Sequence, residues 1–111
     1  MAVVQNFWLM MTEQSRKHWI FDEYQFVARE LQGEYVILHL ESGNYYTLDG
    51  PGGAIFKLVL EDRPEAFIEE ALSRDYRDID RRRIKRDIRD LIQELQGRKM
   101  VRPAPLSSDV S

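Results

Sequence analysis

The sequence contains no cysteine, and this absence excludes disulfides, thiolate metal sites and cysteine nucleophiles. It has only two histidines, His18 and His39, and neither has a second ligand residue at helical or hairpin spacing. No serine or acid lies at motif spacing from either histidine. We therefore expect no metal, no cofactor and no catalytic constellation.

Long hydrophobic runs are also absent. The apolar patch Phe7–Met11 is far shorter than the roughly 20 residues of a transmembrane helix. It also lacks the basic leader and the small-residue cleavage site of a signal peptide. We expect no membrane association and a cytoplasmic location. Two interpretations of the N-terminus stay open: Met10 or Met11 is the real start after an upstream extension, or the segment packs on the domain or on a partner.

Charge of one sign does not dominate, because the formal net charge is −3. The chain as a whole has no electrostatic attraction to nucleic acid or acidic lipid. Its 111 residues, 43% hydrophobic and 32% charged, suit one soluble domain. We expect an N-terminal extension over residues 1–20, one domain over 21–102 and a disordered tail over 103–111.

Three segments in the first half have strand patterns. Alternation predicts strands at Tyr24–Glu30 and Tyr35–Glu41, and a short aromatic strand follows at Tyr45–Leu48. Gln32-Gly33 and Ser42-Gly43-Asn44 separate the strands with residues that suit turns. These segments predict a three-stranded antiparallel meander.

Helical patterns occupy the second half. A glycine-rich corner at Asp49–Gly53 leads into a helix over roughly residues 53–60. Asp62, followed by Pro64 and Glu65, predicts the cap of a second helix that extends to about Tyr76. Asp78 or Asp80 caps a third helix that ends near Gly97. Its apolar stripe contains Ile84, Ile88, Leu91 and Leu95, with Ile92 at the margin. The predicted class is α+β.

The basic run over residues 81–86 has two interpretations. An arginine-rich terminal helix in a strand-containing domain is typical of a winged-helix nucleic-acid-binding protein. Alternatively, Arg83 with Asp87 and Arg86 with Asp90 form ion pairs along an ordinary solvated helix face. We favour the solvated face and keep nucleic-acid binding as the alternative function.

The strand Tyr45–Leu48 also has two interpretations. It fills the core as an ordinary aromatic strand, or its outer edge accepts another peptide as a fourth strand. The second interpretation rests on topology, because an outer strand of a meander has one unpaired edge. Charge and proline, which usually protect such an edge, are missing from this segment.

Three segments together resemble the PqqD family: GNYYTLDGPGGAIFKLV, PEAFIEEALSRDY and IKRDIRDLIQEL. The resemblance covers about residues 35–101. It implies a winged-helix-like domain of three strands and three helices. It also implies a recognition element that binds the leader of a ribosomally made, modified precursor peptide. Such an element presents the leader to a radical S-adenosylmethionine enzyme, a leader peptidase or another modifying enzyme.

The resemblance also implies a site between the third strand and the last helix. Strand addition would use the backbone of Tyr45, Tyr46, Thr47 and Leu48. The facing helix would contribute Arg81, Ile84, Lys85, Ile88 and Ile92, with the two cations available to acidic leader residues. Which margin of the helix faces the strand, and the oligomeric state, stay open. The functional prediction is a non-catalytic leader-binding adaptor, with the nucleic-acid binder and a structural subunit of an enzyme complex as alternatives.

Overall fold

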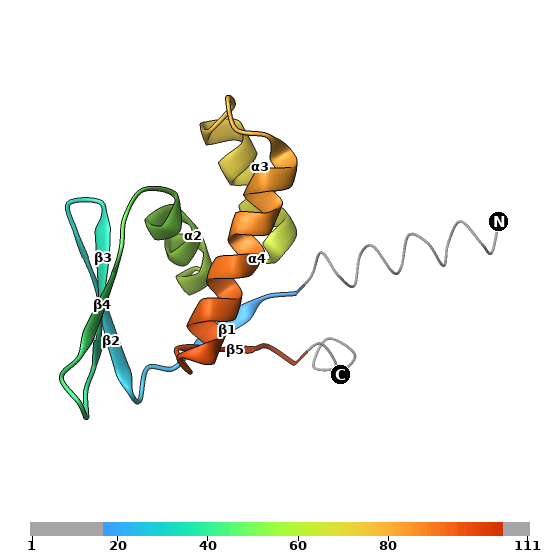
Figure 1. Ribbon diagram of the computed structural model, residues 1–111. Helices are drawn as coiled ribbons and strands as arrows, with labels where there is room; N and C mark the ends of the chain where they lie inside the picture. The colour runs from blue at the N-terminus through green and yellow to red at the C-terminus, as the bar shows by residue number, and fades with distance from the viewer. Residues whose placement is uncertain (1–16, 106–111) are drawn as a thin grey trace.

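The computed structural model describes residues 17–105, and its main sheet is a three-stranded antiparallel meander (Figure 1). The strands are β2 (Phe26–Leu31), β3 (Glu34–His39) and β4 (Tyr45–Leu48), in the spatial order β2-β3-β4. The helices that follow in this part of the chain are α2 (Gly50–Leu60), α3 (Glu65–Asp75) and α4 (Arg81–Gly97). The predicted α+β class, with three strands before three helices, is confirmed.

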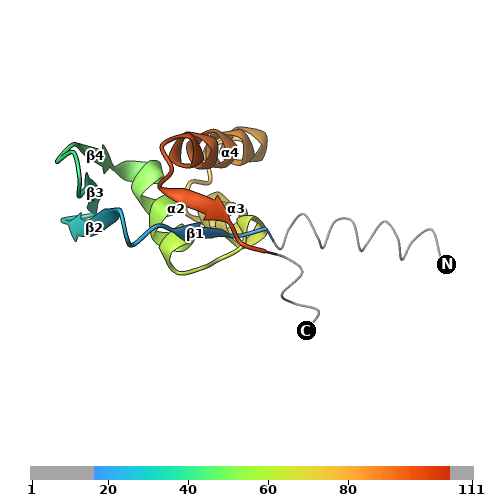
Figure 2. The same ribbon diagram turned by 90° about the horizontal axis from the view of Figure 1, so that it is seen from below.

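A second, two-stranded sheet was not predicted. Strand β1 (Trp19–Phe21) pairs antiparallel with β5 (Val101–Pro103), so that Trp19 lies opposite Pro103. Figure 2 shows this pair alongside the helices and apart from the main sheet. Residues on either side of β5 continue the contact, because Met100 O accepts from Asp22 N at 2.9 Å and Ala104 N donates to His18 O at 2.9 Å. The pair therefore joins the start of the described chain to its end.

The hydrophobic core lies between one face of the main sheet and the helices. On β3 the inward residues are Tyr35 and Ile37, both buried, whereas Leu38 is exposed. Phe56 of α2 is fully buried and packs edge-on against Tyr35 and Phe21, with ring centroids 5.2 and 5.6 Å apart. Such tilted aromatic contacts add to the stabilisation from burial alone. The core thus holds α2 against the sheet.

Helix α2 begins earlier than the sequence predicted. The segment assigned to a corner forms its first turn, with Asp49 as the N-cap residue and Pro51 among the first helical positions. Proline is tolerated there because its missing N–H has no intrahelical partner. At Gly53 a Cβ would lie 3.1 Å from Leu48 O and 3.3 Å from Gly33 O. This glycine therefore allows the helix to approach the sheet backbone closely.

The predicted cap of the second helix was wrong. Pro64, not Asp62, is the N-cap residue of α3, and no side chain caps this helix end. Asp62 instead has a positive φ of 62° and its Oδ1 lies 2.7 Å from His18 Nδ1. The acid thus serves a long-range contact with the start of the domain.

Helix α4 matches its predicted ends. Asp80 is the cap and its carboxylate accepts from Arg82 N at 3.2 Å, while the helix ends at Gly97. The buried residues are Ile84, Ile88, Ile92 and Leu95. Leu91, predicted to lie within the apolar stripe, is only half-buried, whereas Ile92, predicted at its margin, is buried. The buried face of α4 is turned slightly from the expected one, and α3 and β5 also pack on this helix.

The predicted extension and tail fall largely outside the described residues. Trp19 and Ile20, which we assigned to the extension, belong to β1, and Pro103, which we assigned to the tail, belongs to β5. Among residues 17–105, no helix has both the length and the apolar character needed to cross a membrane.

Candidate functional site

Strand β4 has one unpaired edge. It pairs with β3 alone, through the register Leu38–Tyr45 to Tyr35–Leu48. His39 N donates to Asn44 O at 2.8 Å, which marks these two residues as a hydrogen-bonded pair. Hydrogen-bonded and non-bonded pairs alternate along antiparallel strands. Tyr46 and Leu48 therefore bond to β3, whereas the backbone groups of Tyr45 and Thr47 point to the open edge.

The side chains of β4 alternate between the inner and outer faces of the sheet. Leu48 is buried and Tyr46 is half-buried, on the face that meets the helices. Tyr45 and Thr47 lie on the outer face, where Tyr45 is 71% exposed. An incoming strand would thus find two residues with free backbone groups, flanked by inward side chains that contact α4.

The margin of α4 that meets β4 carries Leu91 and Glu94, together with Arg98, the C-cap residue of this helix. The Tyr46 hydroxyl donates a hydrogen bond to Glu94, and the Arg98 guanidinium lies 4.3 Å from the centroid of the Tyr46 ring. Arg98 Nη2 also pairs with Glu94 Oε2 at 3.3 Å. A methyl group on Gly52 would lie 3.5 Å from Leu48 Cδ2 and 3.9 Å from Leu91 Cδ2, so Leu91 approaches the end of β4. We call this margin and the edge of Tyr45–Leu48 the β4 site.

The environment of Tyr46 keeps its hydroxyl protonated. Burial of the phenol raises its pKa above the ordinary value of 10.0, and the hydrogen bond to Glu94 raises the pKa further. Arg98 lowers this pKa and offsets part of the increase. Tyr46 is therefore a hydrogen-bond donor near neutral pH, and nothing in its surroundings makes it a nucleophile.

A cavity of about 270 Å³ opens beside Tyr46 on the inner side of the hairpin. Its walls combine apolar and polar side chains, and it is lined mainly by Phe26, Ile37, His39, Tyr46, Arg98 and Met100. His39 Nδ1 lies 2.7 Å from Ser42 Oγ, which ties its ring to the turn. The cavity has room for one apolar side chain next to a cation.

The structure brings together only part of the predicted site. Ile84, Ile88 and Ile92 are buried in the core, so their side chains have little surface for a ligand. Arg81 pairs with Glu69 and Glu70 of α3 at 3.1 and 2.8 Å. These pairs lower the pKa of Glu70 and raise that of Arg81.

Lys85 lies on the opposite side of α4 from Glu94. The two are nine positions apart, which corresponds to about two and a half helical turns. Of the residues that the sequence assigned to this site, those of β4 are therefore the ones at the open edge. The prediction did not include Leu91, Glu94 and Arg98, although Glu94 and Arg98 have the spacing of a helical ion pair.

The β4 site offers groups for binding a peptide and, among the described residues, no cluster of metal ligands. Within residues 17–105, no group of three or more histidine, aspartate or glutamate side chains could hold a metal ion. The site combines unpaired backbone groups, one ion pair and a largely apolar cavity. These three features together are suited to binding an extended peptide.

Comparison with known proteins places this arrangement in a family. The model of the family described as Coenzyme PQQ synthesis protein D (PqqD) matches residues 34–101, more than half of the chain. The chain belongs to the PqqD family. The resemblance inferred from the sequence is confirmed, and the match includes β3, β4 and all of α2 to α4. No curated relative matches the sequence.

Two solved structures resemble this PqqD-family domain. One is "TbiB1 in Complex with the TbiA(beta) Leader Peptide", with 30% identity, a TM-score of 0.66, and coverage of 73% of this chain and 92% of TbiB1. The other is "Lasso peptide synthetase B1 complexed with the leader peptide", with 22% identity, a TM-score of 0.69, and coverage of 78% and 99%. The second likeness supports the fold alone.

Proposed function

We propose that this protein is a non-catalytic adaptor that binds the leader segment of a ribosomally made precursor peptide. The leader adds to β4 as a fourth strand of the main sheet. The observation that carries the proposal is the unprotected edge of β4, where Tyr45 and Thr47 direct their backbone groups away from β3. Family membership supports it, as does the likeness to TbiB1, a structure that contains a leader peptide.

The β4 site suggests how a leader is held. Backbone pairing with Tyr45 and Thr47 sets the register, and alternate leader side chains then face α4. One apolar side chain enters the cavity beside Tyr46, and an acidic leader residue pairs with Arg98. In this proposal Leu91, Glu94 and Arg98 replace Arg81 and Lys85 as the helical wall, and the buried isoleucines support that wall from behind.

The adaptor then presents the bound leader to a modifying enzyme. A leader peptidase and a radical S-adenosylmethionine enzyme both suit this role, and the protein itself supplies no catalytic group. Because precursor peptides are made on ribosomes, the proposal places the adaptor in the cytoplasm.

Calorimetric titration of the full chain tests the proposal. The probes are the TbiA(beta) leader and the leader of any precursor encoded beside this gene. Duplex DNA is titrated in parallel at two salt concentrations. We expect saturable one-to-one binding of a leader that changes little with salt. Salt-sensitive binding of DNA without affinity for either leader would instead favour the nucleic-acid-binding alternative.

A further inference from the structure

Four exposed cations gather on one side of α4, away from β4. They are Arg82, Lys85, Arg86 and Arg89, and we call this side the basic face. Among the described residues none of the four has an ion pair, whereas Arg81, Arg83 and Arg98 each pair with an acid. Arg86 and Asp90 have the spacing of a helical ion pair, but they do not form one. The basic face is thus uncompensated in a chain with a formal charge of −3.

This arrangement works against helix stability. Arg82 with Arg86, and Lys85 with Arg89, are like charges four residues apart, which repel on a helix surface. The first turn of α4 has no acidic residue, so its cations also lie at the positive end of the helix dipole. A local arrangement that opposes folding without a compensating contact is expected where function requires it.

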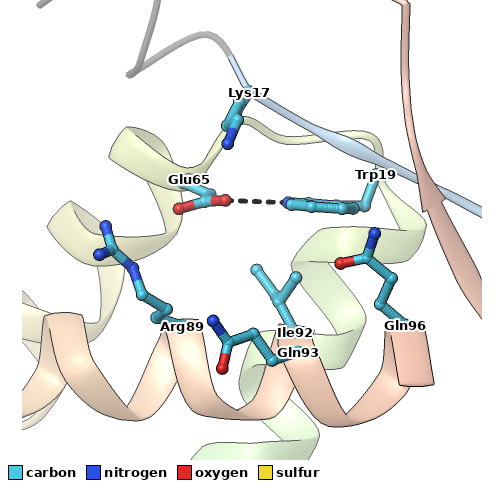
Figure 3. A pocket seen from close by; sticks show the side chains of 7 residues that line it. All are labelled: Lys17, Trp19, Glu65, Arg89, Ile92, Gln93 and Gln96. Carbon is cyan, nitrogen blue, oxygen red and sulfur yellow. Dashed lines mark hydrogen bonds between the residues drawn. The ribbon is translucent and has the colours of Figure 1, made fainter. Parts of the chain in front are cut away.

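A pocket continues the basic face along α4. Its volume is about 390 Å³, and it is bounded by Lys17, Trp19, Glu65, Arg89, Ile92, Gln93 and Gln96 (Figure 3). Arg89 belongs both to this pocket and to the basic face. Trp19 Nε1 donates to Glu65 Oε2 at 3.0 Å, which fixes the indole in place. The pocket therefore presents a rigid aromatic wall held by the Glu65 carboxylate, two amides from α4, and the cations Lys17 and Arg89.

We propose that the basic face and this pocket dock an acidic segment of the enzyme that modifies the precursor. Carboxylates of the segment pair with the four cations, and one of its side chains enters the pocket beside Trp19. This inference rests on the proposed adaptor function. Because the basic face and Glu94 lie on different sides of α4, leader and enzyme bind at the same time, and α4 separates them.

Nucleic acid fits this surface less well. Asp90 lies on the adjacent side of the same helix and has no ion pair among residues 17–105, so the four cations form a narrow strip. A single extended segment can follow such a strip, whereas a duplex presents its phosphates over a broader surface. A pocket with a tryptophan wall and two amides suits a protein side chain, and charge complementarity then selects an acidic segment.

The test uses the full ¹⁵N-labelled chain and a synthetic glutamate-rich peptide with one central tyrosine. We expect the peptide to shift the amide signals of residues 82–93 and the indole signal of Trp19. The signals of Tyr45–Leu48 should stay in place. A saturating amount of the TbiA(beta) leader should change the affinity for the acidic peptide by less than twofold.

Charge reversal supplies the matched comparison. Lys85→Glu with Arg86→Glu removes two cations from the basic face, and we expect at least a tenfold loss of affinity for the acidic peptide. Arg29→Glu with Lys57→Glu gives the same change in net charge at exposed positions on β2 and α2. This control should lose less than twofold.

The outcomes separate the two proposals. Equal losses in both double variants, competition by the leader, no binding of the acidic peptide, or tighter binding of duplex DNA at the basic face would each overturn the inference. If the acidic peptide binds as expected but no leader binds, the adaptor function fails and the second docking surface remains. If a leader binds and the acidic peptide does not, the adaptor function remains and the second docking surface fails.

Discussion

Tyr46 on β4 donates a hydrogen bond to Glu94 on α4, and this contact joins strand and helix across the open edge of the sheet. Arg98 stacks on the same ring and pairs with the same carboxylate. The three side chains therefore hold the C-terminal half of α4 at a fixed position relative to β4. The width of the proposed peptide site depends on this contact.

Proline at Thr47 should weaken leader binding about tenfold, because it removes a backbone donor that faces the open edge. Glu30→Pro is the matched control. By the same alternation its N–H points to the free edge of β2, at the other side of the sheet. Calorimetry with the TbiA(beta) leader measures both variants, and circular dichroism checks the fold. Normal leader binding by Thr47→Pro would show that the leader does not dock on β4.

Alanine substitutions at two leucines of α4 should have separate effects on leader binding and on the stability of the fold. Leu95 is fully buried, so Leu95→Ala should lower the free energy of unfolding by about 2–5 kcal/mol. Leu91 is half-buried beside β4, so Leu91→Ala should cost only about 1 kcal/mol but weaken leader binding about tenfold. Urea denaturation and calorimetry give the two quantities. A Leu91→Ala protein with unchanged affinity would exclude this residue from the site.

Ionisation of Tyr46 should lower the free energy of unfolding at alkaline pH. Its pKa is raised in the folded state, mainly by burial, so the fold favours the protonated phenol. This contribution is complete below about pH 10 and is lost as pH rises through the folded-state pKa. Tyr46→Phe should therefore reduce the fall in unfolding free energy as the pH rises above about pH 10. Part of the fall should remain, because burial also raises the pKa of Tyr35.

Urea denaturation across this range measures the effect of Tyr46→Phe. At about pH 7 the variant should be less stable by about 0.5–1.5 kcal/mol, the net value of one hydrogen bond. An unchanged slope above about pH 10 would show that the phenol is not perturbed.

Two glycine-to-alanine variants should have opposite effects. At Gly53 an added Cβ meets backbone oxygens at 3.1 and 3.3 Å, so Gly53→Ala should destabilise the protein by about 1–3 kcal/mol. At Gly97 a Cβ would meet nothing within 4 Å, and its φ is not positive. Gly97→Ala should therefore stabilise by about 0.4–1 kcal/mol. Thermal unfolding distinguishes the two, and equal effects would contradict the close approach of α2 to the sheet.

The main elements were predictable because they have strong periodic patterns. Helix α4 repeats its isoleucines at helical spacing, and its cap and final glycine mark both ends. The positive φ of Gly33 and Gly43 agrees with the two predicted turns. These features are local, so the sequence alone determines them.

The features that were missed depend on distant contacts. Strands β1 and β5 have three residues each, too few for a periodic pattern, and they pair across most of the chain. Asp62 fits a capping pattern, but it contacts His18 instead. The side of α4 that faces β4 was undetermined, because that choice depends on how α2, α3 and β5 pack against the helix. Glu94 and Arg98 could therefore be recognised only as a helical ion pair.

The pairing of β1 with β5 has a consequence for how such a domain can be used. Because Trp19 lies opposite Pro103, the polypeptide enters and leaves the fold at neighbouring points. A module with adjacent ends can be inserted into a surface loop of a larger protein without stretching either junction. The open edge of β4 belongs to the other sheet, so such an insertion would leave it accessible. The same fold can therefore work as a separate protein or as an inserted part of a larger one.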